Sequence, residues 1–299
     1  MIFLTNLTLP AKISEALLEK SDVEALLALV LVSMLTLVPV TMYKSAYCFT
    51  VGYGCSVLSM ALVLTSLIDD IGDTVSYLAL VAVVYGLRLM LFLLYRDLNV
   101  SGMHNSTKKF DEKFSRLRVL PLACFLSILY AAMLCPLLFA LRQRGVETAS
   151  PVAKLGMSLL RNGGLFLAFN GMLIEAVADQ QKLLIKRRHK AQYGEKKFIS
   201  PTSGLFSFCR HPNYFGEILF WTGILLGGVT SSTLGNVFGV VGWATLVSIM
   251  ISSAKRLDAK QKTNYGDQDE YIRWRARVKH SLLPFGTVKK ATTIDKKII

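Results

Sequence analysis

The chain alternates between long apolar runs and short polar segments. The apolar runs fill blocks of roughly 20 positions, the length that crosses a hydrocarbon core of about 30 Å as a helix. Within lipid the backbone must satisfy its own hydrogen bonds, so each block is expected to be helical. The expected spans cover residues 25–42, 46–68, 75–95, 119–141, 155–176, 213–230 and 233–253. The pattern predicts an all-α polytopic membrane protein with about seven transmembrane helices.

The polar segments between these blocks differ in charge. Lysine and arginine are frequent after the third, fifth and seventh spans, whereas the loop after the second span carries Asp69, Asp70 and Asp73 and no base. Basic loops tend to remain in the cytosol, so the N-terminus is expected in the lumen and the C-terminus in the cytosol. The N-terminus lacks the basic segment that opens a cleaved signal peptide, so the first span is expected to be retained.

Composition narrows the class of protein further. Of the 299 residues, 53% are hydrophobic and 18% are charged, with a formal net charge of +14. The positive charge lies beside the spans, where topology and lipid headgroups account for it, so nucleic acid is not an expected partner. The five cysteines form no CxxC pair, which argues against a disulfide framework and a structural zinc site. No soluble domain fits between the spans, so residues 1–299 are expected to form one membrane domain.

Three groups of polar residues lie at the expected cytoplasmic ends of the later spans. An ionisable side chain at bilayer depth costs several kcal/mol unless it is paired or solvated, so each group is a candidate site. In the first group, Glu175, Asp179, Lys182 and Lys186 recur at helical spacing. A solvated helix end with internal ion pairs is the simpler explanation of this stripe.

The second group is the densest. Pro212 suits a first helical turn, where its missing N–H is no loss. A glutamate one turn inside an apolar span is costly, and a polar ligand would explain it; a capped helix start is the alternative. We expect Asn213, Glu217 and Trp221 to share one helix face. The polar residues between positions 210 and 217 are Arg210, His211, Asn213, Tyr214 and Glu217.

The third group lies in residues 255–277, which are too polar to span and are expected to form an amphipathic cytosolic helix. Arg256 and Lys260 share a face, while Tyr265 and Tyr271 offer aromatic contacts. A basic helix lying on the membrane is the alternative.

Together the three groups supply cations, amides, carboxylates and aromatic rings, which suit a ligand with phosphates, amides and flat rings. A nucleotide cofactor fits this description. No G-x-G-x-x-G motif follows a strand, so a dinucleotide would bind among the helices.

Arg-His-Pro-Asn-Tyr-Phe-Gly-Glu at 210–217, with Gly-Leu-Phe before it and Trp221 after it, resembles the core motif of the steroid 5-alpha reductase superfamily. The similarity is greater to the largely uncharacterised branch of that superfamily. Residues 174–180 and 86–89, with Arg96 following, resemble helix patterns of the same branch. Tyr265-Gly266, Tyr271 and Leu283-Pro284-Phe285 resemble a C-terminal signature shared with sterol C14 reductases. The resemblance covers residues 74–286, and leaves 1–73 without a signature and 287–299 as a basic tail.

The resemblance implies that NADPH binds among the last helices and that the protein reduces a carbon–carbon double bond of a lipid by hydride transfer. Glu217 and Tyr85 would be catalytic, because Tyr85 falls where steroid reductases carry the tyrosine that contacts the substrate carbonyl. A packing role is the alternative for Tyr85. The residues expected to bind NADPH are Asp179, Lys186, Arg210, His211, Asn213, Tyr214, Glu217, Trp221, Arg256, Lys260, Tyr265 and Tyr271.

One departure concerns the substrate. Steroid reductases pair that tyrosine with an earlier intramembrane glutamate, but the first two spans here contain no carboxylate within their apolar stretch. The substrate pocket is therefore expected to differ from that of the steroid reductases. The expected substrate is a steroid, a sterol or another enone-like lipid.

Two other functions remain open. Isoprenylcysteine and phospholipid methyltransferases share Arg-His-Pro-x-Tyr-x-Gly and a similar tail, so an S-adenosylmethionine-dependent methyltransferase is the main alternative. A non-catalytic lipid-binding protein is another. Asn213, Glu217 and the helix with Glu175 and Asp179 favour the reductase. The terminal Lys296-Lys297-Ile298-Ile299 resembles a dilysine retrieval signal of the endoplasmic reticulum.

Overall fold

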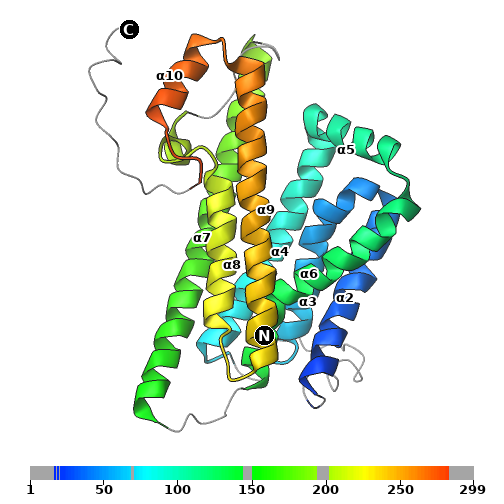
Figure 1. Cartoon of the computed structure of the whole chain (residues 1–299), viewed down its shortest axis with the longest axis vertical. Coiled ribbons are helices and arrows are strands. Elements are labelled where there is room, and N and C mark those ends of the chain that lie inside the picture. Colours follow the sequence, from blue (N-terminus) through cyan, green and yellow to red (C-terminus); the bar gives the residue numbers. More distant parts are fainter. Residues whose placement is uncertain are drawn as a thin grey trace. The chain divides into compact units, whose positions relative to one another are not determined.

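The computed structural model describes residues 17, 19, 21–68, 71–143, 150–193 and 202–282. All regular structure in these ranges is helical (Figure 1). The elements are α2 (Asp22–Tyr43), η1 (Ser45–Phe49), α3 (Val51–Thr65), α4 (Thr74–Asn99), α5 (Ser101–Lys113), α6 (Arg116–Arg142), α7 (Pro151–Tyr193), η2 (Gly204–Ser207), α8 (Pro212–Gly227), α9 (Thr233–Tyr265) and α10 (Asp269–Arg277).

Each expected span coincides with one of these helices, namely α2, α3, α4, α6, α7, α8 or α9. Helices α2, α4, α6 and α9 are long and apolar enough to cross a membrane, and α3 is apolar but shorter. Helix α7 carries Arg161, Asn162 and Asn170 within its expected span, which dilutes its hydropathy. The predicted fold class is confirmed: the protein is an all-α polytopic membrane protein.

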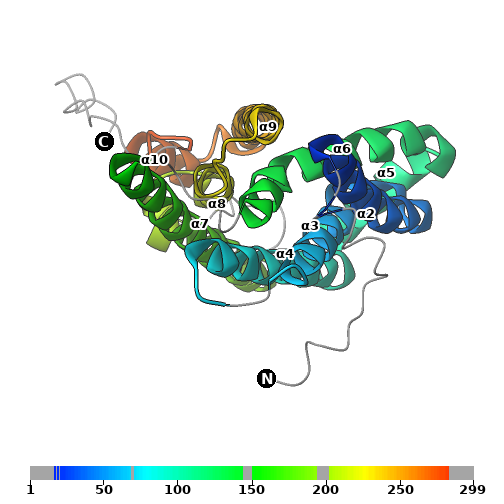
Figure 2. The same ribbon diagram turned by 90° about the horizontal axis from the view of Figure 1, so that it is seen from below.

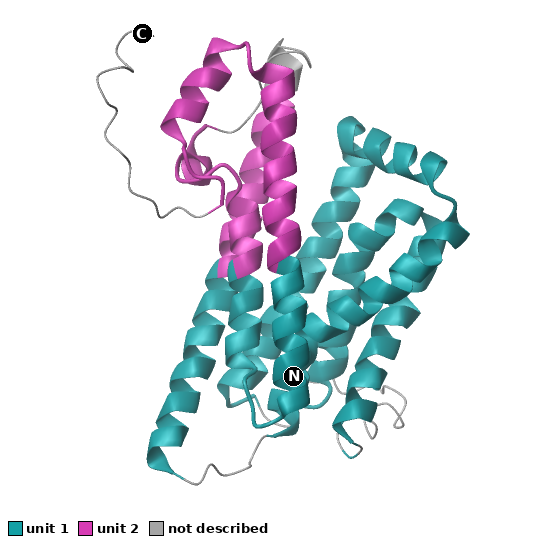
Figure 3. Cartoon of the chain, viewed as in Figure 1, with its two compact units in different colours: residues 1–170, 219–246 teal, residues 171–218, 247–299 magenta. Residues whose placement is uncertain are grey.

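The chain divides into two compact units that share three helices (Figure 3). Unit 1 contains residues 1–170 and 219–246, and unit 2 contains residues 171–218 and 247–299. Helices α7, α8 and α9 each cross the boundary, so their two halves belong to different units.

In unit 1, α3 packs against α4, and α2 packs against α3 and α6 (Figures 1 and 2). Glycine allows the closest of these approaches. A Cβ atom on Gly54 would lie 2.5 Å from the backbone nitrogen of Met90, and one on Gly86 would lie 2.6 Å from that of Leu58. Small residues at such crossings let helices gain dispersion contacts in lipid, where the hydrophobic effect does not drive helix association.

Local sequence signals set two helix starts in unit 1. Ser21 and Glu24 form a capping box at α2, in which the Ser21 hydroxyl accepts from the Glu24 N–H and the Glu24 carboxylate accepts from the Ser21 N–H. The Asp73 carboxylate accepts from the Ser76 N–H at 2.7 Å and caps α4. Of the acidic residues after the second expected span, Asp73 therefore has a structural role.

In unit 2, an aromatic cluster anchors the C-terminal helix. Tyr271, Trp274 and Val278 are buried together, and Tyr265 packs against them. Helix α10 has acids in its first turn and Arg275 and Arg277 in its last, an arrangement that complements the helix dipole.

Three sequence predictions fall outside the described residues. They concern the Leu283-Pro284-Phe285 signature, the terminal Lys296-Lys297-Ile298-Ile299 and the Asp69–Asp70 pair.

Candidate active site

The loop that precedes α8 pairs with the C-terminal segment of the chain. The backbone N–H of Arg210 donates to the carbonyl of His280 at 3.0 Å, and that of His211 donates to the carbonyl of Ser281 at 3.0 Å. Helix α8 then begins at Pro212, because the fixed φ and the missing N–H of proline suit the first position of a helix. The first residues of the octet at 210–217 are thereby held against a segment about 70 positions later in the chain.

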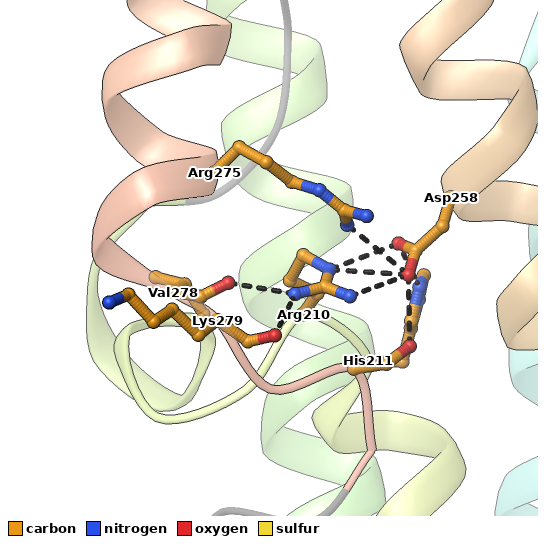
Figure 4. Close-up of polar contacts among 7 residues, drawn as sticks. Arg210, His211, Asp258, Arg275, Val278 and Lys279 are labelled. Carbon is orange, nitrogen blue, oxygen red and sulfur yellow. Dashed lines mark hydrogen bonds and ion pairs between the residues drawn. The ribbon is translucent and has the colours of Figure 1, made fainter. Parts of the chain in front are cut away.

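Arg210 forms a buried ion pair with Asp258 of α9 (Figure 4). Its Nε donates to Asp258 Oδ1 at 3.1 Å, and its Nη2 donates to Oδ2 at 2.7 Å. Its Nη1 donates to the carbonyls of Val278 and Lys279 at 2.8 Å and 2.6 Å. The planar guanidinium thus joins the loop, α9 and the end of α10.

Asp258 also accepts hydrogen bonds from two other side chains and forms an ion pair with a third. The His211 Nε2 lies 3.0 Å from Oδ1, and Nε2 must carry the proton because a carboxylate can only accept. The Ser281 hydroxyl donates to Oδ2 at 3.0 Å, and Arg275 Nη1 lies 3.2 Å from the same oxygen. We call Arg210, His211, Asp258, Arg275 and Ser281 the Asp258 cluster.

His211 is held in the neutral form. Burial lowers the pKa of its imidazole, and the positive charges of Lys182 and Arg210 act in the same direction, while Asp258 partly opposes them. Its ring stacks on Tyr214, with centroids 5.5 Å apart. Among the described residues its Nδ1 has no hydrogen-bond partner, and in this tautomer Nδ1 is an acceptor.

A second set of buried polar side chains comes from α7 and α8 of unit 2. Glu175 and Asp179 of α7 are 3% and 6% exposed, and Asn213 and Glu217 of α8 are 9% and 8% exposed. Gly216 brings the helices together, because a Cβ there would lie 2.6 Å from the Glu175 backbone nitrogen. The Oδ1 atom of Asn213 is buried and has no partner within the described chain.

Buried ionisable side chains are concentrated in unit 2. Within the described ranges, the buried aspartate, glutamate, arginine and histidine residues of unit 2 are Glu175, Asp179, Arg210, His211, Glu217 and Asp258, whereas unit 1 has only Asp97. Burying charge is costly unless partners or a ligand compensate it. This concentration identifies unit 2 as the candidate site.

Comparison with known proteins assigns the chain to a family. A family model described as "Protein of unknown function (DUF1295)" matches residues 27–278. The chain belongs to the DUF1295 family. It is also 38% identical over 92 residues to Steroid 5-alpha-reductase DET2 of Solanum lycopersicum, a stretch that covers 31% of this chain and 33% of that protein. The match spans about one third of the relative's length. No solved structure matches the chain significantly.

These findings confirm the predicted resemblance to the steroid 5-alpha reductase superfamily. The DUF1295 match runs from within α2 to Val278, the residue directly after α10. It therefore includes the octet at 210–217, Asp258 and Arg275.

In this DUF1295 protein, Tyr85 lies in an aromatic cluster of unit 1. Its side chain is fully buried and stacks on Phe220 of α8, with centroids 3.7 Å apart and planes 10° apart. The Trp221 ring meets Tyr85 edge-on at 5.9 Å, and the Trp221 Nε1–H donates to the Tyr53 hydroxyl at 2.8 Å. Tyr85 and Trp221, both expected near the reaction, are neighbours within one unit.

The remaining expected cofactor residues of the DUF1295 chain differ in exposure. Lys186 of α7 and Arg256 and Lys260 of α9 are exposed cations. Tyr265 is half-buried and Tyr271 is buried in the aromatic cluster of α10. The exposed cations can meet a solvated phosphate, whereas Tyr271 is placed to support the fold of the C-terminal segment.

Asp258 and Arg275 were not predicted from the sequence as site residues. The face of α9 expected to be functional, with Arg256 and Lys260, is exposed, and the inward face carries Ala254 and Asp258. The spacing of Ala254 and Asp258 at i, i+4 is a weak sequence signal that both lie on the same, inward face of α9. Asp258 is also the one acidic residue among Lys255, Arg256 and Lys260, which is a second, weak indication that it pairs with a base elsewhere in the chain.

Proposed function

We propose that this protein is a membrane-embedded NADPH-dependent oxidoreductase that reduces a carbon–carbon double bond of a lipid. The observation that carries the proposal is the concentration of buried ionisable side chains in unit 2, in and around the octet at 210–217. The partial relative named as a steroid 5-alpha-reductase supports the reaction class. We propose a steroid, a sterol or another enone-like lipid as substrate.

The residues present fit a nicotinamide dinucleotide. The buried Asn213 Oδ1 and His211 Nδ1 are acceptors without partners among the described residues, and a carboxamide N–H could meet either. Glu217 supplies a further buried acceptor on the same helix as Asn213. Lys186, Arg256 and Lys260 offer exposed cations for phosphate groups, for which lysine and arginine are suited.

Once bound, NADPH would supply the hydride for the β-carbon of an activated double bond. The chain's own contribution is a proton donor at the substrate oxygen. We propose Tyr85 for this role, because a hydrogen bond to developing negative charge counts most where water is excluded. The hydrogen-bond donors of the Asp258 cluster have a different role. They are engaged within the fold, so they hold the octet and the C-terminal segment together.

The endoplasmic reticulum is the proposed location, with the N-terminus in the lumen and the C-terminus in the cytosol. The loop charges and the terminal lysines of the sequence support this address.

The decisive experiment compares two cofactors on the purified full-length protein in detergent. We expect NADPH to bind with micromolar or tighter affinity and S-adenosylmethionine not to bind, as measured by calorimetry. Lipidomics of cells that lack the protein should show an accumulated unsaturated lipid. Binding of S-adenosylmethionine alone would replace the reductase with the methyltransferase, and binding of neither would favour a lipid-binding protein.

A further inference from the structure

Unit 1 contains a cavity of about 350 Å³ between the end of α2, η1, α5 and the start of α6. Pockets for small molecules occupy about 300–1,000 Å³, so this one suits a small polar group rather than a whole lipid. It is lined by Tyr43, Ser45, Asp111, Ser115, Arg116 and Leu117. All of these differ from the residues assigned to NADPH or catalysis, so the cavity is a separate site.

The cavity lies at the ends of two membrane helices. Helices α2 and α6 are both long and apolar enough to span, and the lining comes from the last residue of α2 and the first residues of α6. Tyr43 and Leu117 are 68% and 76% exposed. An exposed tyrosine at a helix end is typical of the membrane–water interface. The cavity therefore opens at the depth of the lipid headgroups.

The lining carries one acid and one base that are not paired with each other. The Asp111 Oδ1 accepts from the Ala46 N–H at 2.9 Å, and within the described ranges its Oδ2 has no hydrogen bond. In the same ranges Arg116 makes no ion pair. Ser115 does not cap α6 with its side chain, so no side-chain acceptor from Ser115 occupies the N–H groups at this helix start.

The wall formed by η1 is held rigidly. Lys44 Nζ lies 2.8 Å from Asp97 Oδ2, and the Tyr47 hydroxyl donates to the same oxygen at 2.7 Å. The Ser45 hydroxyl donates to the Phe114 carbonyl at 3.1 Å. Asp97 is 1% exposed, so these bonds fix η1 against α4 and the end of α5. The site needs little ordering when a ligand binds.

We propose that this cavity binds the headgroup of a phospholipid that carries both a primary ammonium and a phosphate. Asp111 accepts hydrogen bonds from the ammonium, and Arg116, Ser115 and the first N–H groups of α6 donate to the phosphate. A phosphatidylglycerol headgroup has no ammonium and leaves Asp111 beside a second negative charge. The site therefore selects phosphatidylethanolamine over phosphatidylglycerol.

Native mass spectrometry of the full-length protein tests this selectivity. The protein is presented with equal amounts of phosphatidylethanolamine and phosphatidylglycerol, and the retained adducts are counted. We expect one phosphatidylethanolamine to be retained in preference, by about tenfold, because charge-assisted hydrogen bonds are the strong ones. The Asp111→Asn variant keeps an oxygen for the Ala46 N–H but should lose the preference. The Arg116→Gln variant should weaken binding of both lipids.

Two neighbouring variants serve as controls. Glu112→Gln and Arg118→Gln remove the same charges from exposed positions that do not line the cavity, and both should behave as the wild type. Equal retention of the two lipids by the wild type would overturn the proposal. So would a wild-type adduct pattern in both cavity variants. Arg116 is exposed and forms no ion pair among the described residues, so its variant tests the site even if Asp111→Asn destabilises α5.

Discussion

Arg210 and Asp258 lie 48 positions apart and form a buried, doubly hydrogen-bonded ion pair, with Nη2 and Oδ2 2.7 Å apart. The pair connects the loop that starts the octet with α9, and Arg210 also binds the carbonyls that follow α10. The Asp258 cluster thus depends on one carboxylate. This relationship shows that Arg210 and Asp258 support the fold of unit 2.

Loss of the Asp258 charge should loosen the C-terminal segment. Asp258→Asn leaves the Arg210 guanidinium buried without its counter-charge, and breaking a buried pair costs about 3–5 kcal/mol. We expect the backbone N–H groups of Arg210 and His211 to exchange about two to three orders of magnitude faster by hydrogen–deuterium exchange, since about 1.4 kcal/mol is tenfold. The control Asp267→Asn, at an exposed position, should exchange as the wild type.

Acidification should destabilise the same cluster. The folded-state pKa of His211 is below the ordinary value of 6.5, so in the window below pH 6.5 the unfolded chain binds a proton that the folded chain does not. Stability therefore falls as the pH decreases from about 6.5 toward the folded-state pKa. The melting temperature in detergent should drop over this window in the wild type. In His211→Gln the decrease in melting temperature should be smaller. An equal decrease would show that groups other than His211 cause the destabilisation.

Glu217 should contribute to cofactor affinity rather than to stability. Hydrogen bonds to charged groups contribute about 1.5–3 kcal/mol, so Glu217→Gln should weaken NADPH binding about 10–100-fold. The melting temperature should change less than the affinity does, because glutamine keeps the size of the side chain and one of its acceptor oxygens. Calorimetry on the variant, with Glu112→Gln as control, measures both effects. Unchanged affinity would make Glu217 a structural residue.

Tyr85→Phe should separate catalysis from binding. Removing one donor to developing negative charge typically costs about 10²–10³ in rate. The ring that stacks on Phe220 is retained, so the aromatic cluster and NADPH binding should persist. Turnover of the lipid by Tyr85→Phe is compared with that of Tyr77→Phe, an exposed position on the same helix. A wild-type rate in Tyr85→Phe would show that the tyrosine only packs.

The terminal lysines should determine the location of the protein. A tag at the C-terminus would mask them, so the tag belongs between residues 194 and 200. With such a tag, Lys296→Ser combined with Lys297→Ser should release protein beyond the endoplasmic reticulum, as fluorescence microscopy can show. Retention of the double variant would indicate another signal. Asn99 and Asn105 each begin an Asn-X-Ser/Thr glycosylation sequon in the segment placed in the cytosol, so glycosylation at either residue would reverse the proposed orientation.

Local pattern was sufficient to predict several elements. The apolar periodicity located α2, α4, α6 and α9, and Pro212 marked the start of α8 correctly. The helical segment α5 was expected only as a cytosolic loop, because its sequence is polar overall and it contains too few apolar residues to resemble a span. Arg210 and His211 were among the site residues predicted from the sequence, but Asp258, to which both bind, was not.

The sequence by itself determined the class of the protein, because a bilayer requires long apolar helices and these can be recognised from neighbouring residues alone. It also determined the candidate octet, because ionisable residues at the edge of an apolar span are costly wherever the rest of the chain lies. Only the tertiary structure decided that Asp258 rather than Arg256 faces inward, and that Arg210 is engaged within the fold. The reason is physical: the free energy of a buried ion pair depends on how distant segments approach and exclude water, and no local periodicity records that approach.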